Sequence, residues 1–268
     1  MNKFYIQIIF FLLTISLYVN NKALATELAP KTSTTSNSTH HYYTPEEIYE
    51  KNKHLLCTNP EETINAENLM NEAVTHLEYH AKSDDGYELY GKNHYSRMFF
   101  YKKKHKDHTD VLKITFKVYG SDMYNQVVNM FWDPDHATFV NKDSVKIARV
   151  YTPNLVMIQQ RYKKKFGRRQ KYFHALATKV EISEDATIIA YSSADINDHN
   201  SKNTKYFENT IIENANLFKT DIDSEDDIKN GKLKKTFVNL AGYLIENKDK
   251  FVNITYVESV SDIQILIT

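Results

Sequence analysis

The stretch VLKITFKVYG (residues 111–120) has the alternating pattern that decides the fold class. Apolar residues stand at every second position and polar residues between them: Leu112, Ile114, Phe116 and Val118 against Lys113, Thr115 and Lys117. A period of two is typical of a β-strand with one face in a core and one in water. The preceding segment, residues 95–103, predicts the partner strand of a hairpin, and residues 89–90 predict a third, short strand. We therefore expect an antiparallel sheet.

More strands are expected toward the C-terminus. A short amphipathic helix is predicted at residues 122–131, and Pro134 prevents its continuation. The apolar runs after it predict strands at residues 145–151, 155–162, 171–180, 187–194, 210–218, 233–245 and 251–258. So many antiparallel strands must curl around a helix or close on themselves to cover one apolar face.

Two helices are predicted before the first strand. Thr44-Pro45-Glu46-Glu47 has the residue types of a helix start, and Asn59-Pro60 predicts a break. After the break, apolar residues recur at three- and four-residue spacing: Ala66, Leu69, Met70, Ala73, Val74 and Leu77. The element order predicts an α+β, helix-grip fold, in which a curved antiparallel sheet surrounds an α-helix and an apolar interior. That interior is either solid or an internal hydrophobic cavity that holds a ligand.

The composition excludes an electrostatic role for the whole chain. Lys plus Arg equals Asp plus Glu at 34 each in 268 residues, so no net charge draws the protein to nucleic acid or to an anionic membrane. The length suits one globular domain. Cys57 is the only cysteine, which excludes an intramolecular disulfide, and we expect it to pack within a helix.

The N-terminus has the pattern of a secretory signal. Residues 1–25 combine a basic start, an apolar stretch and small residues before the expected cleavage after Ala25, with an uncleaved anchor as the alternative. Residues 26–41 are rich in Thr, Ser and Asn and predict a flexible linker. The folded domain is expected at residues 42–268.

Four stretches carry a resemblance to a known family. They are YNQVVNMFWDPDH (124–136), VKIARVYTPNLVMIQQRYKK (145–164), QKYFHALA (170–177) and FVNLAGYLIENKDKFVNITYVES (237–259). Over residues 42–258 the chain resembles the START domain, a lipid-transfer module with a helix-grip fold, and specifically the secreted fam-a proteins of rodent malaria parasites. The resemblance implies a START-like lipid-binding domain that binds and transfers phospholipid, with phosphatidylcholine as the expected cargo. It also implies secretion into the parasitophorous vacuole or export into the host cell.

The family pattern is matched in part. Phe131-Trp132-Asp133 resembles the Trp-Asp end of the short START helix, which implies structural roles: Trp132 packs the helix on the sheet and Asp133 caps the turn. Two departures stand out. Pro153-Asn154 replaces an Arg-Asp pair of many START domains, and the residues after Glu258 are too short and β-branched for the terminal helix that closes the lipid tunnel.

Strand alternation suggests candidates for contact with a lipid headgroup. The inward-facing candidates are Arg149 with Tyr151, Gln159 with Arg161, and Arg97. An arginine suits a phosphate and an aromatic ring suits a quaternary ammonium. The alternative is that each arginine lies at a rim with its head in water.

A second candidate site is a cationic turn around one aromatic residue. It comprises Lys163, Lys164, Lys165, Phe166, Arg168 and Arg169. It suits transient docking on an anionic membrane surface, and a solvated hairpin tip is the equal alternative. The polar stretches His105–His108 and Asp195–His199 lack the spacing of a metal site, so no metal or cofactor is expected.

The sequence thus favours a non-enzymatic lipid carrier whose partners are a phospholipid and a membrane, without nucleic acid. The alternative is a secreted antigen or host-protein-binding module on a START-like shell without transfer activity. A hydrolase in the same cavity is the third hypothesis, and no catalytic constellation supports it.

Overall fold

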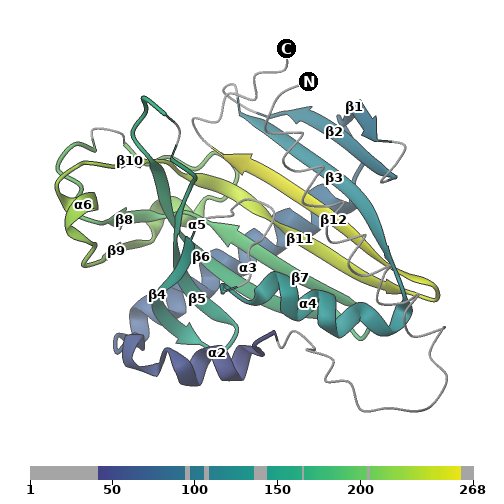
Figure 1. Cartoon of the computed structure of the whole chain (residues 1–268), viewed down its shortest axis with the longest axis horizontal. Coiled ribbons are helices and arrows are strands. Elements are labelled where there is room, and N and C mark those ends of the chain that lie inside the picture. Colours follow the sequence, from purple (N-terminus) through teal and green to yellow (C-terminus); the bar gives the residue numbers. More distant parts are fainter. Residues whose placement is uncertain are drawn as a thin grey trace.

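The computed structural model describes residues 42–93, 97–105, 109–135, 144–164, 166–203 and 206–260. The expected signal peptide and linker, as well as Lys165, lie outside these ranges. An antiparallel sheet with helices on both of its faces makes up most of the described part (Figure 1).

The N-terminal helices begin as the sequence predicts. Helix α2 (Pro45–Lys51) starts with a capping box, in which Thr44 Oγ1 accepts from Glu47 N at 3.3 Å and Glu47 Oε2 accepts from Thr44 N at 2.8 Å. Helix α3 (Pro60–Lys82) follows after the break and is capped by the side chain of Asn59. Each cap satisfies backbone N–H groups that the first helical turn leaves without partners.

Ten strands form the main sheet in the order β1-β2-β3-β12-β11-β7-β6-β5-β4, with β10 beside β6. Strands β8 and β9 form a separate two-stranded parallel sheet. The strands are β1 (Glu88–Asn93), β2 (Met98–Lys104), β3 (Asp110–Tyr119), β4 (Ser144–Thr152), β5 (Leu155–Arg161), β6 (Lys171–Ser183), β7 (Ala186–Ser192), β8 (Asp195–Asn197), β9 (Lys219–Asp221), β10 (Lys234–Lys235), β11 (Val238–Lys248) and β12 (Phe251–Val260). The remaining helices are α4 (Tyr124–Trp132), α5 (Asn214–Leu217), α6 (Asp226–Lys229) and the 3₁₀ turns η1 (Lys53–Leu55) and η3 (Ser121–Met123).

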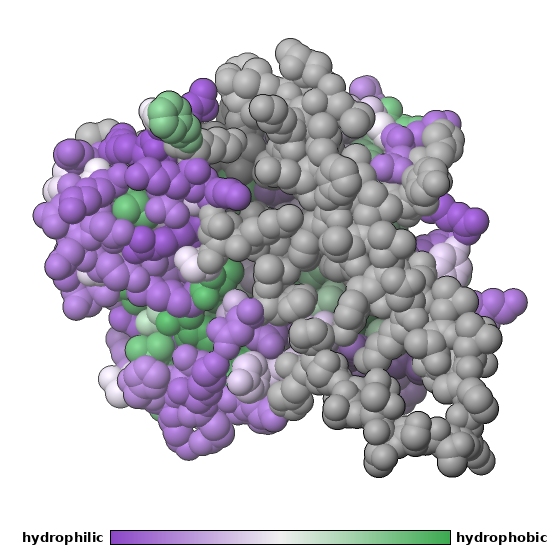
Figure 2. All heavy atoms as spheres, in the orientation of Figure 1, coloured by the Kyte–Doolittle hydropathy of each residue, from purple (hydrophilic) through white to green (hydrophobic). Residues whose placement is uncertain are grey.

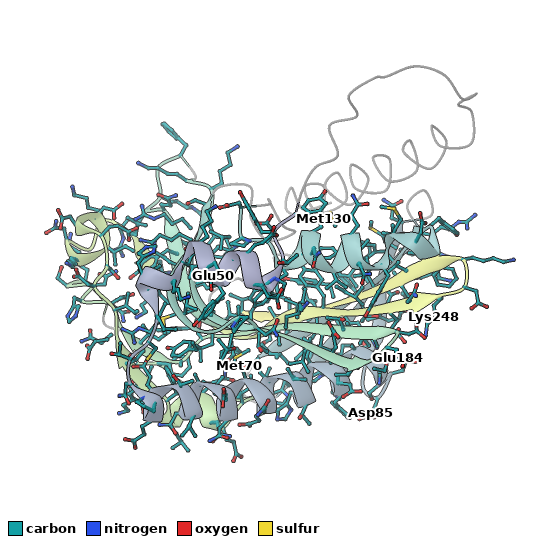
Figure 3. The ribbon with its side chains drawn as sticks, turned by 90° about the horizontal axis from the view of Figure 1, so that it is seen from below. Glu50, Met70, Asp85, Met130, Glu184 and Lys248 are labelled. Atoms are coloured by element: carbon teal, nitrogen blue, oxygen red, sulfur yellow. The ribbon has the colours of Figure 1, made fainter. Side chains whose placement is uncertain are left out.

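The two faces of the sheet build two cores. Figure 3 shows α3, marked by Met70, on one side of the sheet, and α2 and α4, marked by Glu50 and Met130, on the other. Strand β7 shows the alternation, because Ile188 packs in the core with α3 and Ile189 in the core with α4. The predicted α+β, helix-grip fold, with its curved antiparallel sheet, is confirmed.

One predicted strand is wrong. Residues 210–218 hold helix α5 and irregular backbone instead. The Asn209 side chain explains the difference, since its Oδ1 accepts from the backbone N–H groups of Ile211 at 2.9 Å and Ile212 at 3.0 Å. Such local side-chain bonds compete with the ladder bonds of a sheet.

Two smaller expectations also need correction. The predicted strand at 233–245 is two strands: β10 pairs parallel with β6, and β11 begins at Val238 after the chain has changed partner. Cys57 lies between η1 and α3 and not within a helix, and its backbone N–H donates to Val150 O at 2.8 Å. Helix α3 does not extend back to Cys57, because Pro60 disfavours helical backbone at Asn59, which is extended.

Candidate functional site

An internal cavity lies between the sheet and the helices on the face opposite α3. Its volume is about 50 Å³, and α2 and α4 contribute Ile48, Phe131 and Trp132 to its wall. Strands β5 and β11 contribute Val156, Ile158, Ala241 and Tyr243, among other residues. Figure 2 shows apolar side chains gathered on the surface over β4 and β5, the same region of the molecule. The wall is therefore mainly apolar.

Stacked aromatic rings make part of the wall. The ring centroids of Phe131 and Tyr243 are 4.3 Å apart, and those of Tyr243 and Tyr256 are 5.0 Å apart. The hydroxyl of Tyr191 donates to Phe131 O at 3.3 Å and so joins β7 to the end of α4. Large aromatic surfaces suit contact with apolar acyl chains, and the faces of aromatic rings attract cationic groups.

Several buried hydrogen-bond donors of the wall lack acceptors within the described residues, among them those of Trp132 and Gln160. Trp132 Nε1 and Gln160 Nε2 have no hydrogen-bond partner within the described residues, although the two side chains are only 6% and 5% exposed. An unsatisfied buried donor costs about 1–3 kcal/mol. They come from different elements, α4 and β5, and line the same cavity. Groups of this kind are expected where a ligand supplies the acceptor.

Among the described residues, Glu258 is one of two buried acids that line the cavity, the other being Asp133. Burial raises the pKa of Glu258 to about 7, and the nearby Tyr256 hydroxyl opposes that rise. No lysine or arginine belongs to the part of the wall formed by described residues. The carboxyl therefore has no basic partner in the wall, and its charged form is disfavoured.

Trp132 and Asp133 join α4 to the cavity and to the start of the domain. Trp132 is the last residue of α4 and is buried against the cavity. Asp133 Oδ1 accepts from Asp135 N at 2.9 Å, and its Oδ2 accepts from Tyr43 N at 3.1 Å. Asp133 thus holds the turn after the helix and fixes the residues before α2.

Arg149 and Tyr151 lie together, away from the cavity. Arg149 Nη1 and the Tyr151 hydroxyl both donate to Glu62 Oε1 of α3, at 2.5 and 2.8 Å. Arg149 also donates to Thr220 and Asp221 of β9. Burial alone would lower the pKa of Arg149, but hydrogen bonding to Glu62 outweighs it and the pKa is raised. The guanidinium joins three elements in an ion-paired cluster.

Gln159 and Arg161 also face away from the cavity. Arg161 donates to both carboxylate oxygens of Asp227, at 2.6 and 2.9 Å, which is the bidentate geometry of a strong ion pair. Gln159 Oε1 lies 3.1 Å from His174 Nε2 in a buried polar network under α6. None of these four side chains, Arg149, Tyr151, Gln159 and Arg161, lines the cavity.

The remaining candidates lie on the surface. Arg97 precedes β2 and donates to the Tyr119 hydroxyl at 2.6 Å. Phe166 is fully exposed at 106%, between β5 and β6. The described cations near it are exposed or partly exposed: Lys163, Lys164, Arg168 and Arg169. Lys165 lies outside the described residues.

Sequence reasoning missed Gln160 and Glu258 as cavity residues. Both positions follow from strand alternation: Gln160 shares a face with Val156 and Ile158, and Glu258 shares one with Tyr256. The pattern alone does not say which of the two faces is the cavity face, since both faces of this sheet are covered by helices.

Further properties of the described residues bear on function. None of their helices is long and apolar enough to cross a membrane. In the described ranges, His, Cys, Asp and Glu form no group of three or more that would hold a metal ion.

Comparisons with known proteins give partial structural matches. No family model matches the chain, and no curated protein matches it. Human STARD10 is 14% identical with a TM-score of 0.46, over 70% of this chain and 65% of that one. Human StAR-related lipid transfer protein 5 is 10% identical with a TM-score of 0.48, over 74% and 83% of the two chains. A STAR-related lipid transfer protein from Xanthomonas axonopodis is 10% identical with a TM-score of 0.41, over 66% and 81%.

The chain thus spans less than two thirds of the length of human STARD10. At these identities and TM-scores, we infer the function of this chain from its own residues alone.

Proposed function

We propose that this protein is a non-enzymatic lipid carrier that holds phospholipid in its internal cavity and exchanges it at membranes. The observation that carries the proposal is the apolar cavity with the donors Trp132 and Gln160 on its wall. An apolar wall with a few polar groups that fix orientation is typical of a small-molecule site.

Phosphatidylcholine is the proposed cargo among phospholipids. The wall combines aromatic rings with the acid Glu258 and has no basic residue in its described part. Quaternary ammonium groups are attracted to aromatic faces and to carboxylates. An anionic headgroup would instead lie beside Glu258 without a cation to pair it.

Lipid uptake requires the cavity to widen. Its volume of about 50 Å³ is far below the roughly 300–1,000 Å³ of ordinary ligand pockets. Helices α2 and α4 each cover the cavity by only a few side chains, among them Ile48, Phe131 and Trp132. We propose that outward movement of these helices admits the acyl chains.

Destination and family are proposed from the sequence resemblance alone. We propose that the chain is a fam-a START protein of a malaria parasite, secreted through residues 1–25 into the parasitophorous vacuole or exported into the host cell. The transient membrane partner is assigned to the turn around Phe166, which is fully exposed.

Native mass spectrometry after incubation with phosphatidylcholine vesicles tests the carrier proposal. The parent is expected to retain one phospholipid after separation from the vesicles. Ala177→Val, which adds two carbons to a cavity residue, is expected to retain much less. Ala186→Val on β7 lies outside the cavity and is the matched control.

A second candidate function is favoured by the small volume of the cavity. A secreted antigen or host-protein-binding module would use the outer surface and hold no cargo. A parent that carries no lipid in this experiment contradicts the carrier and supports the surface module.

A further inference from the structure

The cavity wall presents two kinds of polar group, N–H donors and a carboxyl. Trp132 Nε1 and Gln160 Nε2 are N–H donors, buried and without acceptors in the described part of the chain. Glu258 is a carboxyl on β12 and accepts hydrogen bonds or faces a cation. A ligand that satisfies all three must offer acceptor oxygens to the first pair and a donor or a positive charge to the third.

We propose that Trp132, Gln160 and Glu258 form a headgroup site that selects lipids without net negative charge. The inference rests on the proposed carrier function and names the ligand class of that cavity. Trp132 and Gln160 donate to oxygen atoms of the headgroup or its ester groups. Glu258 binds the positively charged end of the same headgroup or accepts a hydrogen bond from it.

The described arginines near the sheet do not supply a counter-charge to the cavity. Arg149 is bound to Glu62 at 2.5 Å, and Arg161 is bound to Asp227 at 2.6 Å. Both ion pairs lie outside the cavity wall. An anionic headgroup would therefore meet neutral donors and a carboxyl, with no basic side chain among the described wall residues. Desolvation of an unpaired anion is unfavourable, and the carboxyl adds repulsion when it is charged.

The protonation state of Glu258 depends on its burial and on the groups that face it. Tyr256 on its own strand and Tyr162 at the end of β5 are the titratable neighbours that interact with it. Burial raises the pKa of Glu258 to about 7, so a large fraction of the empty protein carries an uncharged carboxyl at neutral pH. A cationic headgroup favours the charged form, and a hydroxyl is accepted by either form.

Lipid selectivity is the test of this site. The full-length protein is incubated with three acyl-matched lipids in separate vesicle preparations: phosphatidylcholine, diacylglycerol and phosphatidylglycerol. We expect at least tenfold more bound phosphatidylcholine or diacylglycerol than phosphatidylglycerol. A larger share of phosphatidylcholine assigns Glu258 to the choline cation, and a larger share of diacylglycerol assigns it to a hydroxyl.

Variants that remove one polar group each show which residues carry the selectivity. Trp132→Phe and Gln160→Met are expected to weaken binding of the preferred lipid about five- to tenfold, the usual effect of one lost neutral hydrogen bond. Glu258→Gln is expected to narrow the difference between the neutral lipids and phosphatidylglycerol. Ala186→Val on β7 lies outside the cavity and is the control, expected to bind lipid like the parent.

Two results overturn the inference while leaving the carrier intact. One is equal binding of phosphatidylglycerol, and the other is polar variants that bind lipid like Ala186→Val. A parent that takes up none of the three lipids overturns the carrier proposal and this inference together. Thermal unfolding of each lipid-free variant identifies loss of folding. Gln160→Met should not lower the melting temperature of the lipid-free protein, because the lost Nε2 has no partner within the described residues.

Discussion

At the scale of single residues, Glu258 should make stability depend on pH. Its pKa rises from the ordinary value of 4.5 for a glutamate to about 7 on folding. Below pH 4.5 the carboxyl is protonated in both states, so its contribution is constant. Between pH 4.5 and 7 the folded state keeps a proton that the unfolded state releases, so stability falls as pH rises. The expected loss is about 3 kcal/mol.

Urea unfolding of the parent and of Glu258→Gln at pH 5 and pH 8 measures this effect. The variant cannot titrate at position 258, so its stability should fall less than that of the parent over the same interval. Other titrating groups contribute equally to both proteins and cancel in the difference. Equal pH dependence of the two proteins would show that Glu258 is not held in its neutral form.

The candidate residues show how well strand alternation alone predicts which face of the sheet a side chain occupies. It correctly places Arg149 and Tyr151 on one face, since both bind Glu62. It also predicts Ile147 on that face, yet Ile147 lines the cavity. The pairing of β4 with β5 shifts register between Ile147 and Arg149, and such a bulge changes the face of every residue after it. No sequence pattern here marks the bulge.

At the scale of elements, the approach of β11 to β7 depends on Gly242. Its φ is 150°, and a Cβ at this position would lie 2.1 Å from Ile189 O on β7. Gly242→Ala should therefore separate the two central strands and destabilise the protein by about 3 kcal/mol. For a chain of this size the melting temperature would fall by roughly 6–12 °C.

Gly91→Ala is the matched control for the same change in a strand. A Cβ at Gly91 would meet nothing closer than 3.8 Å, and β1 is at the edge of the sheet. Its melting temperature should stay within about 2–4 °C of the parent's. Scanning calorimetry of both variants distinguishes a backbone clash at Gly242 from a general intolerance of alanine in strands. Equal decreases in melting temperature would contradict a special role for Gly242.

Most elements are predictable because their signals are local. The Thr44 capping box and Asn59-Pro60 fix the starts of α2 and α3 within the neighbouring residues. The predictions of secondary structure fail where a side chain or a residue distant in sequence determines the backbone conformation. The Asn209 side chain bonds to Ile211 and Ile212 and removes a predicted strand.

At the scale of the whole molecule, one hairpin joins the cavity to the outer surface. Tyr162 at the end of β5 and Phe173 on β6 line the cavity, and Phe166 is exposed in the turn between the strands. A membrane bound at this turn would lie next to the strands that form the cavity wall. The sequence predicted the cationic turn, but its link to the cavity appears only in the structure, where Tyr162 and Phe173 at the base of the turn line the cavity.

Membrane docking by this turn predicts a salt-sensitive interaction with anionic vesicles. Each lysine near such a surface contributes about 1 kcal/mol, so Lys163→Ala with Lys164→Ala should weaken vesicle binding roughly thirtyfold. The double variant Leu217→Ala with Lys219→Ala is the control, since it changes an exposed apolar residue and a cation elsewhere. Vesicle sedimentation at low and high salt measures both. In the proposed mechanism, lipid exchange requires docking next to the cavity, so lipid transfer should slow in the Lys163/Lys164 variant and not in the Leu217/Lys219 variant. Equal slowing in both variants would place the docking surface elsewhere.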